Sequence, residues 1–151
     1  MILSKKKEQE RFIRFAIVGS IGAIIDIGIF NLLSSIIRIP ALTAQAISFS
    51  VAVISNFLWN RYWTYPDSRN KAVMRQLVQF IVVSVIGLAA RTLIFDRLEE
   101  ALIWSATQIL PQKFFVTPTI VGHNISLGIV IIIIMFWNFF INRFWTYNDV
   151  E

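Results

Sequence analysis

Two arginines, each flanked by asparagines and a tryptophan, are the residues of this sequence best suited to bind a ligand. Residues 56–65 read NFLWNRYWTY and residues 138–147 read NFFINRFWTY. The residues of interest are Asn56, Asn60, Arg61 and Trp63 in the first copy, and Asn138, Asn142, Arg143 and Trp145 in the second. Within each copy the two asparagines and the tryptophan share one face of a continuing helix. Because a guanidinium fork suits phosphate, the two copies predict one phosphate or pyrophosphate site.

Aromatic residues at these helix ends have a simpler interpretation as anchors at the membrane surface. Tryptophan and tyrosine gather where a bilayer meets water, so we interpret Trp63, Trp145 and the neighbouring tyrosines as interfacial anchors. For the paired asparagine and arginine we favour ligand binding. Arg14 is a further candidate for an anionic headgroup, although basic residues before a first membrane helix commonly set its orientation.

Two opposite charges lie inside apolar stretches at equivalent places. Asp26 follows Phe15 by eleven residues, and Arg91 follows Phe80 by eleven. A lone charge in the bilayer centre costs at least about 2.5–3.5 kcal/mol, so such residues pair or line a polar cavity. We predict an ion pair between Asp26 and Arg91. The pair either locks the two halves together, or it opens when Arg91 exchanges Asp26 for a passing phosphate. Asp96 is a candidate second partner of Arg91.

Four apolar stretches position these residues. The chain has 151 residues, of which 56% are hydrophobic and 15% charged, whereas soluble domains carry about 25% charged residues. The stretches cover about 12–37, 41–60, 77–98 and 118–140, and each is long enough to cross about 30 Å of hydrocarbon. We therefore predict an all-α membrane protein. Residues 99–117 are expected to form an extracytoplasmic loop or short surface helix, or a lid over the bundle.

The internal repeat and the basic residues define the expected topology. Repeat 1 covers about 11–65 and repeat 2 about 76–147, within a single membrane domain. Each repeat holds two helices, so both hairpins should have the same orientation. Ten of the fourteen basic residues lie at the N-terminus, in the middle loop or after the last helix. The positive-inside rule then places both termini in the cytoplasm, and this explains the basic charge without nucleic acid.

The doubled motif also resembles a known family. The pattern Arg14-Phe15 leading to Val18-Gly19 and Gly22, the mid-helix Asp26, and the repeated Asn-Arg-aromatic-Trp-Thr-Tyr ending are similar to the GtrA family of small membrane proteins. The resemblance implies translocation of a polyprenyl-phosphate-linked sugar across the cytoplasmic membrane, for the glycosylation of cell-surface polysaccharide. It supports an acid at Asp26 better than a base at Arg91.

Other functions remain open on the sequence. A non-transporting subunit that anchors a polyprenyl-phosphate glycosyltransferase is the first alternative, and a small proton-coupled cation exporter using Asp26 is the second. No nucleophile with a base, paired surface carboxylates or glycine-rich phosphate loop is visible in the sequence, so we expect no enzyme. With no cysteine and one histidine, we expect no metal and no cofactor. A homodimer is a reasonable expectation for so narrow a bundle.

Overall fold

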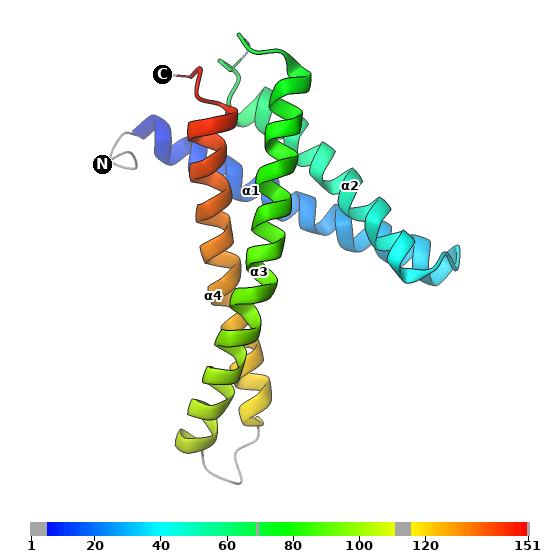
Figure 1. Ribbon diagram of the computed structural model, residues 1–151, viewed down its shortest axis with the longest axis vertical. Coiled ribbons are helices and arrows are strands. Elements are labelled where there is room, and N and C mark those ends of the chain that lie inside the picture. The colour runs from blue at the N-terminus through cyan, green and yellow to red at the C-terminus, as the bar shows by residue number, and fades with distance from the viewer. Residues whose placement is uncertain (1–5, 69, 111–115, 151) are drawn as a thin grey trace. The chain divides into compact units, whose positions relative to one another are not determined.

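The computed structural model describes residues 6–68, 70–110 and 116–150, and these residues form helices joined by short turns. The helices are α1 (Lys6–Asn31), α2 (Ala41–Trp59), α3 (Val73–Ile109) and α4 (Pro118–Ile141). All four are long and apolar enough to cross a membrane, and no strand occurs in the described ranges. Figure 1 shows α1 and α2 as one hairpin and α3 and α4 as another. The predicted all-α membrane fold is confirmed.

Three helices end in a wider π-helical turn. These turns are η2 (Leu32–Ile36) after α1, η3 (Asn60–Thr64) after α2 and η4 (Asn142–Thr146) after α4. A π-turn has hydrogen bonds between residues five apart and recurs at functional positions. The repeated sequence thus carries a repeated backbone irregularity, η3 matching η4.

The chain forms two compact units, which are described separately below. Unit 1 comprises Met1–Val82 with Ile141–Glu151, and unit 2 comprises Val83–Phe140. Unit 1 therefore holds all of repeat 1 together with the two ends of repeat 2. The boundary between units does not follow the boundary between repeats.

The first hairpin turns at Arg38, whose φ of 63° is left-handed. The Ile39 N–H donates to the Leu33 carbonyl across 2.9 Å, and this hydrogen bond satisfies a carbonyl at the end of the helix. Pro40 then caps the start of α2, where its missing N–H costs nothing. The turn is short, so α1 and α2 lie antiparallel.

Small side chains allow α1 and α2 to pack closely. Gly22 is buried on α1, and a methyl group at this position would overlap the Asn56 side chain on α2. The equivalent glycine of repeat 2, Gly87, faces Asn138 in the same way, with a Cβ there 3.1 Å from Asn138 Oδ1. A Cβ at Gly19 would have nothing within 4 Å. Close packing therefore requires glycine at Gly22, and a similar glycine–asparagine contact occurs in both repeats.

The third helix is longer than the sequence predicts. We expected it to end near residue 98, but α3 continues to Ile109 and is 37 residues long. At 1.5 Å per residue this is about 55 Å, well beyond the hydrocarbon thickness. Residues 99–109 therefore extend α3 instead of forming a separate surface helix or loop. Of the remaining expected loop, 111–115 lie outside the described residues.

Polar contacts connect α3 to α4 within unit 2. His123 Nδ1 lies 2.7 Å from Glu99 Oε1, and its ring meets Phe95 edge-on at 5.3 Å. Gly122 is buried, and a Cβ there would lie 2.7 Å from the Ile103 backbone nitrogen. The two helix backbones therefore touch where α4 has no side chain.

We predict that Gly122→Ala destabilises the protein, whereas Gly128→Ala does not. Alanine favours a helix over glycine by up to about 1 kcal/mol, but at Gly122 overpacking against backbone should cost about 1–3 kcal/mol. Gly128 lies on the same helix with nothing within 4 Å of its Cβ position. Thermal unfolding in detergent, followed by circular dichroism, measures both variants. Equal melting temperatures for the two variants would contradict the close packing at Gly122.

Candidate functional site

The two predicted motifs end in matching π-turns within unit 1. The Tyr65 N–H donates to the Asn60 carbonyl, and the Tyr147 N–H donates to the Asn142 carbonyl, both at 2.8 Å. The wider turn changes which side chains face inward. Asn60 shares the buried side with Thr64 and Tyr65, not with Trp63. The expectation that Trp63 continues the asparagine face is therefore wrong, because it assumed ordinary α-helical spacing.

The two tyrosines that end the motifs stack on each other. The rings of Tyr65 and Tyr147 have centroids 4.3 Å apart and an angle of 17° between their planes. Neither residue is exposed at all. Our interpretation of these tyrosines as surface anchors is therefore wrong. Trp63 is partly buried and Trp145 is 43% exposed, and for them the anchoring role stays a prediction.

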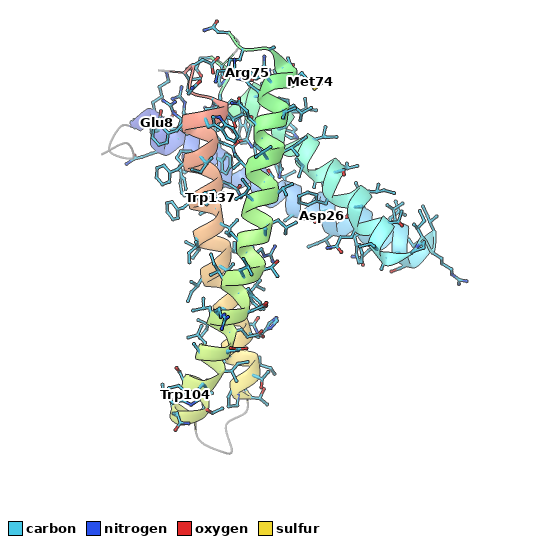
Figure 2. All side chains as sticks on the ribbon, viewed as in Figure 1. Glu8, Asp26, Met74, Arg75, Trp104 and Trp137 are labelled. Carbon is cyan, nitrogen blue, oxygen red and sulfur yellow. The ribbon has the colours of Figure 1, made fainter. Side chains whose placement is uncertain are left out.

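A buried carboxylate connects the start of α1 to the end of α4. Glu8 accepts hydrogen bonds from Arg11, and both its oxygens lie 3.2 Å from Arg143 Nε; Figure 2 marks Glu8 near the start of α1. Arg11 also donates to Asp67 at 2.7 Å. Partial burial raises the pKa of Asp67, but its own backbone hydrogen bond and the charges of Arg11 and Lys7 lower it by more. Three segments are thus joined by ionic contacts.

Repeat 2 makes the corresponding connection with a glutamine in place of the arginine, through a serine hydroxyl, to an aspartate. Gln76 matches Arg11, each four residues before the phenylalanine that aligns the repeats, and Asp149 matches Asp67. Gln76 Nε2 donates to Ser68 Oγ at 2.6 Å, and the Ser68 hydroxyl donates to Asp149. The structure therefore keeps the repeat symmetry in its contacts even where the residue types differ.

Basic side chains cap the carbonyls that the π-turns leave open. Arg14 Nη1 donates to the Trp63 carbonyl at 3.0 Å, and Lys71 Nζ donates to the equivalent Trp145 carbonyl at 3.3 Å. A cation is favourable at the carbonyl end of a helix. Arg61 donates through Nη2 to the Lys71 carbonyl at 3.5 Å. Part of the basic charge at this end therefore stabilises the turns.

The charged groups of one repeat act on the tyrosine of the other. Burial raises the pKa of Tyr147, and the positive charge of Arg61 opposes this shift. Burial and the negative charge of Glu8 raise the pKa of Tyr65, while Arg143 lowers it. Arg61 of repeat 1 thus lies near Tyr147 of repeat 2, and Arg143 near Tyr65.

Several buried polar atoms of this end have no hydrogen-bond partner among the described residues. They include Arg61 Nη1, the hydroxyls of Tyr65, Tyr147 and Thr64, and the acceptor oxygens Asn60 Oδ1, Gln76 Oε1 and Asp149 Oδ2. Leaving a buried donor unsatisfied costs about 1–3 kcal/mol. Arg61 Nη1 and the three hydroxyls can donate hydrogen bonds, so these four groups suit an anion with several acceptor oxygens, whereas the amide and carboxylate oxygens only accept.

The predicted asparagines have structural roles as well. Asn60 Nδ2 donates to the Asn56 carbonyl at 2.9 Å, and Asn142 Oδ1 accepts from the Thr146 hydroxyl at 2.7 Å. Asn56 lies against Gly22, and Asn138 belongs to unit 2. The structure thus brings Asn56, Asn60 and Asn142 into unit 1.

The predicted charge pair is divided between the two units. Asp26 belongs to unit 1, where it lines a pocket with Gln45 and Ser48. Arg91 is exposed on the part of α3 that belongs to unit 2. Their pairing stays a prediction.

Sequence reasoning missed the residues that join the segments at this end. Glu8 is an acid among lysines and arginines, so a buried role was not apparent from its neighbours. The two aspartates carried a usable signal: Asp67 and Asp149 each follow the motif tyrosine by two residues, so the repeat extends further than we drew it.

We predict that Glu8→Gln destabilises the protein by about 3 kcal/mol, because removing one partner leaves a buried charge uncompensated. The side chains of Glu8, Arg11 and Arg143 are at most 14% exposed. Glu10→Gln is the matched control, since Glu10 is exposed on the same helix and should change stability by less than about 0.5 kcal/mol. Unfolding in mixed detergent micelles gives both values. A loss at Glu8 no larger than at Glu10 would refute the buried connection.

We also predict that the protein unfolds in alkali when its stacked tyrosines ionise. The folded-state pKa values of Tyr65 and Tyr147 lie above the ordinary value of 10.0. The resulting stability is therefore complete below about pH 10 and is lost as the pH rises above it. Tyrosinate absorbance and circular dichroism should show that two of the three tyrosines ionise only with unfolding. Reversible ionisation of all three in the folded state would contradict their burial.

Comparison with known proteins gives two relatives. The chain is 27% identical to the uncharacterized membrane protein YngA of Bacillus subtilis (strain 168) over 136 residues, which cover 90% of this chain and 78% of that protein. It is 26% identical to the dolichol-phosphate mannosyltransferase of Pyrococcus furiosus over 88 residues, or 58% of this chain and 25% of the enzyme.

The chain also matches the family described as GtrA/DPMS, transmembrane domain, over residues 14–147. This range contains both motif copies and all four apolar stretches. The chain is a multi-pass membrane protein and belongs to the GtrA/DPMS transmembrane-domain family.

Proposed function

We propose that this protein moves a polyprenyl-phosphate-linked sugar across the cytoplasmic membrane, and that the phosphate binds at the polar end of unit 1. The family supports this proposal, since one relative is a dolichol-phosphate mannosyltransferase and therefore handles a lipid of the same chemical class. We assign no catalytic step to this protein. Its task is to shelter a polar headgroup while the apolar tail stays in lipid.

The observation that supports the phosphate site best is the buried donor of Arg61. This residue is 5% exposed, and its Nη1 atom has no hydrogen-bond partner in the described part of the chain. Tyr147, whose buried hydroxyl also lacks a partner, lies close enough for Arg61 to influence its pKa. Phosphate offers several acceptor oxygens and negative charge, so it suits both a guanidinium and a hydroxyl donor.

The charge balance of this end favours an anion. The contacts described above involve six basic side chains and three carboxylates: Lys7, Arg11, Arg14, Arg61, Lys71 and Arg143 against Glu8, Asp67 and Asp149. Arg143 and Arg11 share Glu8, so the excess rests mainly on the other basic groups. Arg14 is only partly buried and lies 5.7 Å from the Trp63 ring, in a position to meet a headgroup at the membrane surface.

The sequence predicted that Arg61 and Arg143 bind phosphate in equivalent ways, but in this proposal the two arginines have different roles. Arg143 bonds Glu8 and the Tyr147 carbonyl, whereas Arg61 donates to the Lys71 backbone carbonyl. Arg61 therefore binds the phosphate, and Arg143 holds the end of α4 in place through Glu8. Asn60 contributes its buried Oδ1 atom, an acceptor suited to a sugar hydroxyl.

A second candidate function is favoured by the mannosyltransferase similarity. The similar stretch covers only 25% of that enzyme, so the same kind of segment occurs there inside a longer catalytic protein. A subunit that holds lipid substrate for a separate glycosyltransferase would need the same phosphate site. It would not need to move the headgroup across the bilayer.

The two functions separate in proteoliposomes that contain the purified protein and a short-chain polyprenyl-phosphate glucose. We predict that wild type moves the headgroup faster than empty liposomes, and that Arg61→Gln slows this movement by about tenfold. Loss of one hydrogen bond to a charged group, about 1.5–3 kcal/mol, has this effect or more. Arg75→Gln is the matched control because Arg75 is an exposed arginine of the same unit, marked in Figure 2.

Two outcomes would change the proposal. If folded wild type moves no lipid but binds it in an Arg61-dependent way, the subunit function replaces translocation. If Arg61→Gln and Arg75→Gln behave alike, the phosphate site is not at Arg61. Circular dichroism and melting temperature establish that each variant is folded.

A further inference from the structure

An open, mainly apolar pocket with three polar side chains lies between α1 and α2, away from the arginine-rich end. Its volume is about 250 Å³, and it is lined by Asp26, Ile27, Phe30, Gln45 and Ser48. All five residues belong to unit 1 and to the membrane-spanning parts of α1 and α2. Figure 2 marks Asp26 well along α1 from Glu8.

The pocket forms because of the side chains that α1 and α2 present to each other. On α1 the buried residues Phe15, Val18 and Gly22 face the hairpin interior, and Asp26 continues this row one turn later. On α2 the position opposite is Ser48, which is fully buried but small. A small side chain opposite an acid leaves space that a larger apolar residue would fill.

Repeat 2 does not keep this polar lining. Counting from the aligned motifs, the positions of Asp26, Gln45 and Ser48 correspond to Arg91, Leu127 and Val130. Val130 is fully buried, so a larger apolar side chain stands where repeat 1 has a serine. One repeat therefore carries a pocket with three polar side chains, while its sequence counterpart has two apolar residues and the opposite charge.

The depth of the pocket separates it from the phosphate site. Asp26 follows Arg14 by twelve residues on one helix, which is about 18 Å along the axis. A sugar joined directly to a lipid phosphate is much shorter than that distance. One headgroup therefore cannot place its phosphate at the arginine-rich end and its sugar in this pocket at the same time.

We propose that the Asp26 pocket binds the hydroxyl groups of the sugar at a second station, reached after the phosphate leaves Arg61. This inference rests on the proposed function and names a separate part of the same route. A carboxyl group accepts hydrogen bonds from hydroxyls, and an amide such as Gln45 both donates and accepts. Phe30 and Ile27 give the apolar wall that small-molecule pockets usually have beside their polar groups.

Binding of a sugar would lower the free-energy cost of keeping the Asp26 side chain inside the membrane. A charged or polar group in hydrocarbon is costly unless it is paired or solvated. Sugar hydroxyls would supply Asp26 with donors, and Asp26 would supply the sugar with acceptors that replace water. The pocket thus lowers the cost of holding a polar headgroup inside the membrane.

The test uses a short-chain polyprenyl-phosphate glucose that carries a photoreactive diazirine on its sugar. In nanodiscs holding the full chain, we expect the label in residues 25–30 and 45–48. Gln45→Leu and Ser48→Val introduce the residues of repeat 2 and should reduce that label and the movement in proteoliposomes by about tenfold, the effect expected from loss of a polar contact. Binding of farnesyl phosphate, which has no sugar, should change less than about twofold.

Ser50→Val is the matched control. Ser50 lies on α2 two residues beyond Ser48 and is exposed, and its hydroxyl donates to the Ala46 carbonyl of the same helix at 2.7 Å. The same substitution there should leave labelling and movement unchanged. Gln45 is an exposed residue, so Gln45→Leu keeps the test available if Ser48→Val fails to fold.

The outcomes separate this inference from the proposed function. Label in the pocket that the variants remove, in a protein that moves no lipid, supports the sugar site while translocation fails. Movement by wild type with no label in the pocket, or with label that Gln45→Leu leaves unchanged, overturns the sugar site alone. Movement abolished by Asp26→Asn but untouched by Gln45→Leu and Ser48→Val also overturns it, because Asp26 would then act only through its charge.

Discussion

The shared ion pair of Glu8 with Arg11 and Arg143 is the interaction on which the polar end depends. It joins residues 135 positions apart in the chain, the start of the first helix and the turn that ends the last. A carboxylate that is almost fully buried is tolerated only when its charge is compensated. Here two arginines compensate it, and one of them also bonds Asp67. Around this connection lie the stacked tyrosines and the two π-turns.

The repeat explains why this end contains so many matched groups. The ends of both motif copies belong to unit 1, and there the Tyr65 and Tyr147 rings meet. Equivalent carbonyls, those of Trp63 and Trp145, each receive a cation. The copies nevertheless differ in charge, since Arg11 corresponds to Gln76. In our proposal such differences give the two arginines different roles: Arg143 supports the end of α4, and Arg61 binds the phosphate.

Two polar regions at different depths suit a transporter better than a single deep site would. Tight binding of a whole headgroup in one place would slow its release. In our proposals the phosphate first binds near the membrane surface at Arg61, and the sugar hydroxyls later bind near Asp26, which lies about 18 Å along α1 from Arg14. Each region recognises a different chemical group, so neither has to hold the complete ligand.

The sequence by itself determined the membrane class, the four helices and the repeat, because each rests on local composition, length or motif spacing. It predicted the motif residues of the polar end but not their partners. The burial of Tyr65 and Tyr147 and the role of Glu8 depend on contacts between distant segments, which periodicity does not encode. Because of the π-turn, Trp63 does not lie on the buried side with Asn60. Helix α3 continues through charged residues to Ile109. Only the tertiary structure decided these points, because burial and pairing are set by what packs alongside a helix and not by its own sequence.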